Sequence, residues 1–347
     1  MANTITVFCM YIFVFHIPYY EKQYGRNHIM NKQKIGIVGC GFVGATIAYT
    51  LMSSSLFSEI VLIDIDEKKA KGEAMDLNHC LPFIAPMQIY AGNYTNLEDA
   101  AIVIVAAGAN QKEGETRIDL VQRNSKITTS VVERIASVNK ECIILMVSNP
   151  VDVLTYVALK VSGFPPSRVI GSGTVLDTAR LKFLVGERLG VDSRNVHTFI
   201  IGEHGDSELA VWSSANVSGL DLKDYFPICD NCGRYEDLYG IYDYVKNSAY
   251  EIIRGKGATY YAIAQATLRI VTSIIKDQNT ILPVSTLVDG HYGLEDLCIS
   301  VPAVIGKKGI THVLDIPLND DENRRLRASA ETLKDVINAL EISKVNA

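Results

Sequence analysis

The amino-acid sequence predicts an α/β protein, with an N-terminal doubly wound parallel β-sheet followed by a C-terminal α+β domain. In the first half of the chain, short uninterrupted apolar segments alternate with helix-like segments. Strands of a parallel sheet are buried on both faces, so they appear as continuous apolar runs. The second half combines long amphipathic helices with apolar segments linked by turns, which is typical of antiparallel hairpins.

Four strands are expected in the first half, over residues 35–38, 60–64, 101–105 and 142–147. A helix follows the first strand and runs to about residue 53, and a charged helix follows the second over residues 66–77. Strands that alternate with helices in this way form an open parallel sheet.

The second half is expected to begin with a helix over residues 174–190 and a strand over 196–201. A long helix over 244–277, broken near Gly257, follows, and a polar-faced helix over 319–340 is the last element. Three further strands, joined by glycine-containing turns that suit hairpins, cover residues 281–287, 297–304 and 311–314.

The composition excludes several classes of protein. The chain has 347 residues, 48% of them hydrophobic and 21% charged, as in globular proteins. A net charge of −6 without a basic run argues against a nucleic-acid partner. Seven scattered cysteines, an odd number, predict reduced thiols in a cytoplasmic protein. Cys229 and Cys232 have no second pair of ligands at zinc spacing, so we expect an incidental reduced pair and no metal site.

A glycine-rich turn, Gly39–Gly44, lies between the first strand and the first helix, and Asp64 follows at the end of the next strand. Gly39 permits the tight turn, Gly41 lets a pyrophosphate approach the backbone, and Gly44 lets helix and strand pack closely. Asp64 can bind ribose hydroxyls and would repel a 2′-phosphate. The pattern therefore predicts a Rossmann domain that binds NAD rather than NADP.

One histidine stands out among the seven in the chain. His204 lies in a glycine-flanked turn after an apolar strand, and Asp177 and Arg180 share one face of an upstream helix. An aspartate that accepts a hydrogen bond from one ring nitrogen fixes the tautomer and stabilises imidazolium. The other nitrogen can then donate a proton to a carbonyl as hydride arrives, while the arginine can clamp a carboxylate.

From about residue 33 to residue 340 the chain resembles the bacterial L-lactate dehydrogenases of the lactate/malate dehydrogenase family. The matching motifs, in chain order, are GCGFVG at 39–44, GEAMDL at 72–77, AGANQ at 107–111, GETR at 114–117, SNPVD at 148–152, GTVLDTAR at 173–180, GEHGD at 202–206 and KGAT at 256–259. This many motifs in the same order are specific to the family.

The resemblance implies a role for each matching residue. His204 would be the proton donor and acceptor, Asp177 its partner, and Arg180 the residue that holds the substrate carboxylate. Arg117 would polarise the substrate carbonyl from a loop over 108–117 that closes over the site. Asn149 and Thr259 would contact the substrate. The cofactor would contact Gly39, Gly41, Val43, Gly44, Asp64, Lys69, Tyr94, Gly108, Ala109, Ser130, Val147 and Asn149.

Gln111 is the residue expected to select the substrate. In the malate branch an arginine usually stands here and pairs with a second carboxylate, whereas a neutral glutamine tolerates the methyl group of pyruvate. The leading prediction is therefore NAD-dependent interconversion of L-lactate and pyruvate. Two alternatives remain open: a dehydrogenase of malate or another 2-hydroxy acid, and an inactive NAD-binding protein with a structural or sensing role.

The resemblance also raises the question of regulation and assembly. Family members are usually homotetramers, and many bacterial ones are activated by fructose 1,6-bisphosphate held by an arginine and a histidine of each subunit. Here Lys182 occupies the arginine position and His197 the histidine position. Because lysine cannot bind phosphate in a planar bidentate manner, we expect any activation to be weak, salt-sensitive and stronger at acidic pH.

Residues 1–29 do not match the rest of the chain. Residues 4–20 form an apolar, aromatic run that is short for a membrane span and lacks the features of a signal peptide. We therefore expect an extension upstream of a functional start at Met30, and no membrane association. The expected domains are a nucleotide-binding domain over 30–171 and a substrate domain over 172–347.

Overall fold

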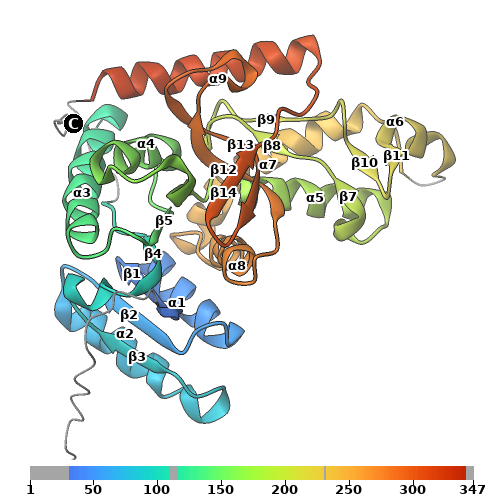
Figure 1. The fold of residues 1–347 in the computed structure, drawn as a ribbon. Coiled ribbons are helices and arrows are strands. Elements are labelled where there is room, and N and C mark those ends of the chain that lie inside the picture. Colours follow the sequence, from blue (N-terminus) through green and yellow to red (C-terminus); the bar gives the residue numbers. More distant parts are fainter. Residues whose placement is uncertain (1–30, 110–115, 230–231, 341–347) are drawn as a thin grey trace, which may run out of the picture.

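The computed structural model describes residues 31–109, 116–229 and 232–340 of the protein (Figure 1). A nine-stranded sheet runs through them in the order β14-β13-β12-β6-β5-β4-β1-β2-β3. Its strands are β1 (Asn31–Val38), β2 (Glu59–Ile63), β3 (Gln88–Ala91), β4 (Ala100–Val105), β5 (Ile143–Met146), β6 (Val169–Gly171), β12 (Thr280–Val288), β13 (Leu297–Gly306) and β14 (Gly309–Val313).

The first six strands are parallel and follow the doubly wound order 3-2-1-4-5-6. The helices that connect or follow them are α1 (Phe42–Ser54), α2 (Glu67–Asn78), α3 (Arg117–Val138) and α4 (Val151–Ser162). The predicted fold class is confirmed. Each strand predicted here is present, with bounds that differ by a few residues at most.

Both faces of the parallel sheet are covered, which explains the uninterrupted apolar runs. Ile102 and Ile104 of β4 pack in one core with α1 and with α8 (Tyr261–Ile275). Val103 and Val105 of the same strand pack in the opposite core with α3, α4 and α9 (Asp320–Asn338). Successive side chains point to opposite faces, so a strand covered on both sides needs an apolar residue at every position.

The remaining helices build a third core. Here α5 (Val175–Leu189) packs against α7 (Asp237–Lys256), and Trp212 and Tyr242 contribute the largest side chains. The short elements nearby are β7 (Val196–His197), β8 (Ile200–Ile201), β9 (Leu209–Ala210), β10 (Asn216–Val217), β11 (Leu220–Asp221) and α6 (Leu222–Tyr225). Among the described residues, no helix is both long enough and apolar enough to cross a membrane.

The C-terminal strands differ from expectation in where they pair. β12 lies antiparallel to β6, with Ser285 opposite Gly171, so the C-terminal hairpins extend the parallel sheet instead of forming one of their own. A strand edge left bare by β6 has unpaired backbone groups, and β12 satisfies them. The antiparallel pairing itself was predicted.

Two boundaries in the second half also differ. The strand predicted over 196–201 is divided into β7 and β8, because Thr198 and Phe199 hydrogen-bond the backbone of Val211 instead of a neighbouring strand. The helix predicted over 244–277 begins earlier, at Asp237, and the predicted break near Gly257 is confirmed, since it divides the segment into α7 and α8. Gly257 ends the first of them with a φ of 83°, a conformation that favours glycine.

The prediction of reduced cysteines is wrong for one pair. Cys229 and Cys232 are joined by a disulfide, with their Cα atoms 5.5 Å apart. Cys232 is buried in the core between α5 and α7, and its amide donates to the Cys229 carbonyl at 3.4 Å. This Cα separation lies within the range that a disulfide bridges. Four other described cysteines are free: Cys40, Cys80, Cys142 and Cys298.

Candidate functional site

A cavity of about 670 Å³ opens at the carboxyl ends of β1, β2 and β4. The chain leaves the neighbouring strands β1 and β4 in opposite directions along the sheet, and ligands of doubly wound sheets bind at this switch point. Seven of the predicted cofactor residues line the cavity: Gly39, Gly41, Asp64, Lys69, Tyr94, Gly108 and Ser130. Val43, Gly44, Ala109, Val147 and Asn149 do not line it.

The three glycines of the turn have the geometry that a nucleotide loop needs. Gly39 has a φ of +99°, which side chains disfavour. A Cβ atom at Gly44 would lie 1.8 Å from the Gly39 carbonyl oxygen, so only glycine allows this helix to approach. A Cβ atom at Gly41 would meet nothing within 4 Å, so the backbone there is open to a ligand. The residues present therefore fit a dinucleotide.

Asp64 is held at the end of β2 by two backbone groups. Its Oδ2 accepts from the Cys40 amide at 2.6 Å, and its Oδ1 accepts from the Asp66 amide at 2.9 Å. The carboxylate therefore has a defined orientation at the rim of the cavity before any ribose arrives. Adenosine ribose hydroxyls at this position would meet an acceptor, and a 2′-phosphate would meet a negative charge.

One wall of the cavity was not predicted. Arg123, Lys126 and Arg134 line it from α3, together with the predicted Ser130, and the Arg134 guanidinium lies 5.4 Å from the centre of the Tyr94 ring. These positions recur at helical spacing from Ser130, and that spacing was the signal that could have found them. They give the cavity a positively charged side for a phosphate-bearing ligand.

Asn124 of α3 connects the two strand ends beside the cavity. Its Oδ1 accepts from the Ala109 amide at 2.8 Å, and its Nδ2 donates to the Asn149 carbonyl at 2.9 Å. The predicted residues Ala109 and Asn149 are thus held at adjacent carboxyl ends, after β4 and β5. Asn124 is buried and was missed, because no sequence pattern marks an amide that bridges two loops.

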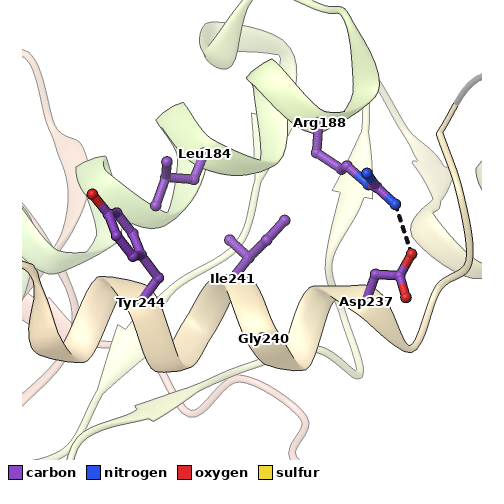
Figure 2. A pocket seen from close by; sticks show the side chains of 6 residues that line it. All are labelled: Leu184, Arg188, Asp237, Gly240, Ile241 and Tyr244. Carbon is purple, nitrogen blue, oxygen red and sulfur yellow. Dashed lines mark hydrogen bonds and ion pairs between the residues drawn. The ribbon is translucent and has the colours of Figure 1, made fainter.

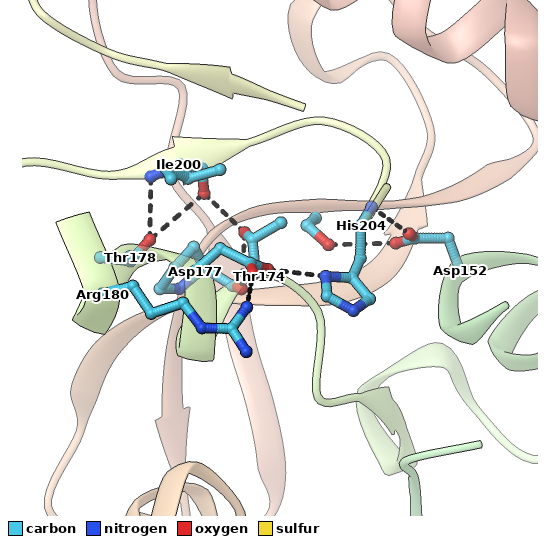
Figure 3. Close-up of polar contacts among 9 residues, drawn as sticks. Asp152, Thr174, Asp177, Thr178, Arg180, Ile200 and His204 are labelled. Carbon is cyan, nitrogen blue, oxygen red and sulfur yellow. Dashed lines mark hydrogen bonds and ion pairs between the residues drawn. The ribbon is translucent and has the colours of Figure 1, made fainter. Parts of the chain in front are cut away.

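The second half of the site is a cluster around His204 (Figure 3). Asp177 Oδ2 lies 2.6 Å from His204 Nδ1, and Arg180 donates to the other oxygen, Oδ1, at 2.9 Å. Asp177 and Arg180 project from the first turns of α5, three residues apart. The Asp177 side chain is 5% exposed, whereas that of His204 keeps 26% of its surface exposed. The structure therefore brings together three of the predicted residues and leaves part of the ring open.

Long-range contacts hold the turn that carries His204. The His204 amide donates to Asp152 Oδ2 at 2.7 Å (Figure 3). Ser300 of β13 donates to the other oxygen, Asp152 Oδ1, at 3.0 Å. Gly202 exchanges backbone hydrogen bonds with Ser300, and the Glu203 amide donates to Ser329 Oγ of α9 at 2.8 Å. Thus α4 from the first half of the chain, together with β13 and α9 from the C-terminal half, defines where the imidazole lies.

Charges around His204 favour its protonated form. Burial alone would lower the pKa of His204, but Asp177, with smaller contributions from Asp152 and Glu208, raises it to about 9. Burial alone would likewise raise the pKa of Asp177, but His204 and Arg180 lower it. The pair is therefore an imidazolium and a carboxylate at neutral pH, and the imidazolium can donate a proton.

Glu208 is a further carboxyl group beside this pair, and the sequence reasoning missed it. One potential metal-ligand atom from each of Asp177, His204 and Glu208 lies within 4.8 Å of the other two. Within the described part of the chain, these three residues therefore have the spacing of a cation site. The Arg180 guanidinium and the proton on His204 oppose such a cation electrostatically. The arrangement suits proton transfer better than metal binding.

The other predicted substrate residues are placed only in part. Gln111 lies outside the described residues. Arg117 is the first residue of α3, after Thr116, which caps the helix. Thr259 precedes α8 in the turn where the Tyr260 ring stacks on Phe42 of α1, with ring centres 5.7 Å apart. This contact brings the Thr259 turn beside the glycine-rich loop.

Comparisons with known proteins agree with this architecture. Residues 33–171 match the NAD-binding domain model of the lactate/malate dehydrogenases, and residues 174–342 match their α/β C-terminal domain model. The chain belongs to the lactate/malate dehydrogenase family. The predicted family and NAD as the cofactor are therefore confirmed.

Curated relatives and solved structures support the same conclusion. An L-lactate dehydrogenase of Acetivibrio thermocellus is 56% identical over 89% of this chain and 98% of the relative. L-lactate dehydrogenase 1 of Clostridium acetobutylicum is 48% identical over 88% and 98%. The crystal structure of a minor L-lactate dehydrogenase from Enterococcus mundtii superimposes with a TM-score of 0.87 at 41% identity, over 90% of this chain and 99% of that one.

Proposed function

We propose that this protein is an NAD-dependent L-lactate dehydrogenase, which interconverts L-lactate and pyruvate. The observation that carries the proposal is the His204–Asp177–Arg180 cluster, which lies in the same chain as a cavity fitted to NAD. The 56% identity to a curated L-lactate dehydrogenase supports the same activity. When bound, the nicotinamide supplies or accepts the hydride.

The proton moves through His204. Its Nδ1 is held by Asp177, so Nε2 is the nitrogen that donates to the carbonyl oxygen of pyruvate or accepts from the hydroxyl of lactate. Asp177 keeps the ring in one orientation and stabilises the imidazolium formed during lactate oxidation. The guanidinium of Arg180 uses one nitrogen for Asp177, and its remaining donors bind the substrate carboxylate.

The segment over 108–117, of which residues 110–115 lie outside the described residues, is proposed to act with Arg117 as a closing lid. Arg117 polarises the substrate carbonyl, and closure excludes water, which strengthens the effect of its charge. Asn149 and Thr259 line the substrate region. Asn149 follows the carboxyl end of β5, and Thr259 lies in the turn before α8. Both places are compatible with contact to the substrate.

The activity is tested by assaying the purified protein with NADH or NADPH and a panel of 2-oxo acids. We expect pyruvate with NADH to give the highest kcat/KM. Preference for oxaloacetate or for a bulkier acid would favour the alternative 2-hydroxy-acid dehydrogenases. NADH binding without turnover of any acid would favour an inactive NAD-binding protein.

Gln111 is proposed as the residue that rejects dicarboxylates. Gln111→Arg would place a guanidinium opposite the second carboxylate of oxaloacetate. When pyruvate is bound, the same guanidinium would face a methyl group and have no partner. A hydrogen bond to a charged group contributes about 1.5–3 kcal/mol, so the ratio of kcat/KM for oxaloacetate to that for pyruvate is expected to rise roughly 10- to 100-fold. An unchanged ratio would assign discrimination to another residue.

The protein is further proposed to be a homotetramer of the cytoplasm, with Met30 as its functional start and domains over 30–171 and 172–347. Large apolar side chains are exposed on α2, α5 and α7, among them Met75 at 62%, Phe183 at 55% and Tyr244 at 51%. A surface cavity of about 390 Å³ also lies between α5 and α7, where Leu184 and Ile241 face each other and Arg188 pairs with Asp237 at 2.6 Å (Figure 2). Such surfaces are commonly buried between copies of a chain. Light scattering measures the mass of the protein in solution and so tests the proposed tetramer.

Activation by fructose 1,6-bisphosphate is proposed to be weak, through Lys182 and His197. Lys182 lies on α5, which packs against β7, where His197 is exposed. Burial and the neighbouring Arg269 lower the pKa of Lys182, so its charge weakens at alkaline pH. Pyruvate saturation curves at two pH values, with and without the bisphosphate, test this. Tight activation that persists at alkaline pH would contradict the role of Lys182.

A further inference from the structure

Glu208 is a buried carboxyl group that the proposed mechanism does not use. It immediately precedes β9, and 4% of its surface is exposed. Its Oε1 has no hydrogen-bond partner in the described part of the chain. A buried ionised carboxylate without a partner is costly, so a group in this position is normally paired or uncharged.

Charged and titratable groups face Glu208 from each element around it. Asp177 and Arg180 approach from α5, Lys246 from α7, and His204 from its own turn. The Tyr242 hydroxyl of α7 donates to the Glu208 carbonyl oxygen and so holds the backbone at this point. Arg325 of α9 donates in turn to the Tyr242 hydroxyl at 3.2 Å.

These surroundings keep Glu208 uncharged at neutral pH. Burial, followed by repulsion from Asp177, raises the pKa of Glu208 to about 8, although His204, Arg180 and Lys246 act in the opposite direction. The pKa of His204 is likewise raised, to about 9, so both groups lose their protons in the alkaline range. The two groups lie within 4.8 Å, so the charge of one affects the other.

We propose that Glu208 is a positioning residue that holds the proton on His204 in alkaline solution. While Glu208 is protonated, it adds no charge and the Asp177–His204 pair acts alone. When Glu208 ionises, its negative charge joins that of Asp177 beside the ring, and the imidazolium persists to higher pH. The inference rests on the proposed function, because it assigns Glu208 to the proton transfer of that reaction.

The test is the pH profile of kcat/KM for pyruvate with NADH in the wild-type protein and in Glu208→Gln. Glutamine has nearly the same shape but stays neutral. At neutral pH the two proteins should have equal rates. The alkaline limb of the variant should shift to lower pH by about one unit, which is about a tenfold loss of rate on that limb. In the direction of lactate oxidation His204 must be neutral, so the rate falls as the ring is protonated at low pH. In Glu208→Gln this acid limb should also shift to lower pH by about one unit.

Asp243→Asn serves as the matched control, because it removes one negative charge from an exposed position of α7. Its profile should superimpose on that of the wild type. Glu208→Asp keeps an ionisable carboxyl and should restore part of the alkaline shoulder. Superimposable profiles for Glu208→Gln and the wild type would overturn the inference, as would an equal loss of rate at every pH.

A second measurement does not depend on turnover. Infrared difference spectra of the wild-type protein between neutral and alkaline pH should lose the carbonyl stretch of a protonated carboxyl, and this change should be absent in Glu208→Gln. Absence of that band from the wild type would also contradict the inference. If the band is present but the wild type does not reduce pyruvate, the proposed function fails while the protonation of Glu208 stands.

Discussion

The cofactor cavity and the proton-transfer cluster are built in different ways. The cavity is lined by residues from one continuous part of the chain, between Val38 and Arg134, and its key features are backbone conformations. The cluster is assembled by contacts between residues far apart in the sequence: 52 positions separate Asp152 from His204, and 148 separate Asp152 from Ser300.

The charges of the two regions differ as well. Asp64 is intermediate in exposure at the rim of its cavity, whereas Asp152 and Asp177 are 1% and 3% exposed. The amides that Asp64 holds lie at a partly exposed rim, where solvent can replace a lost hydrogen bond, whereas the partners of a buried charge lose theirs without replacement when the charge is removed. We therefore expect different substitutions to affect different properties: those at the cavity rim should change the choice of cofactor, that of His204 should lower catalysis, and those of buried charges should also lower stability.

The largest effect is expected for His204→Ala, which removes the proton donor but not the nucleotide cavity. Proton transfer of this kind contributes roughly 10²- to 10⁴-fold, so kcat should fall by that amount while NADH still binds. Steady-state kinetics and NADH fluorescence titration measure the two quantities. A nearly normal kcat would remove His204 from the mechanism, and loss of NADH binding would mean that the two regions are not separable.

Asp64→Asn should instead change the choice of cofactor and leave the proton-transfer cluster intact. Without the negative charge, repulsion of a 2′-phosphate is relieved, and a charge-assisted hydrogen bond to ribose becomes a neutral one. At about 1.5–3 kcal/mol for a charged hydrogen bond, the kcat/KM ratio of NADH to NADPH should fall roughly 10- to 100-fold. Asp76→Asn, at an exposed position of α2, is the control. An unchanged ratio would mean that Asp64 does not select the cofactor.

Asp152→Ala tests whether distant contacts position His204. The substitution leaves the His204 amide and the Ser300 hydroxyl without their buried acceptor, at a cost of about 1–3 kcal/mol for each unsatisfied group. We expect a lower melting temperature and a lower kcat, with KM for NADH unchanged. Asp152→Asn keeps an acceptor oxygen and should lose less of both. If Asp152→Ala were as stable and active as the wild type, the contact would be dispensable.

The smallest effect is expected for a protein that starts at Met30. The strand pattern begins at residue 35, and β1 pairs with its neighbours from Lys34 and Asn31 onward. The shortened protein should have the melting temperature and kcat/KM of the full chain. A loss of either would assign a role to residues 1–29.

Much of the cofactor region could be predicted because its signals are local. A glycine turn between a strand and a helix, followed by an aspartate at the next strand end, depends only on neighbouring residues. The helix break at Gly257 was predictable for the same reason. Asn124, Arg123 and Arg134 were missed, since they act through one face of a helix against distant loops.

The sequence by itself determined seven of the nine strands of the main sheet, but not β3 or β6. It also determined where the nucleotide loop turns, and that an aspartate and an arginine share a helix face with a histidine downstream. Only the tertiary structure decided that β12 joins β6 in one sheet, that Asp152 and Ser300 hold the His204 turn, that Glu208 lies beside the Asp177–His204 pair and that Cys229 meets Cys232. The physical reason is that backbone conformation and apolar periodicity depend on adjacent residues. The pairing of buried polar groups depends instead on which elements pack together, and burial then alters the charge that each group carries.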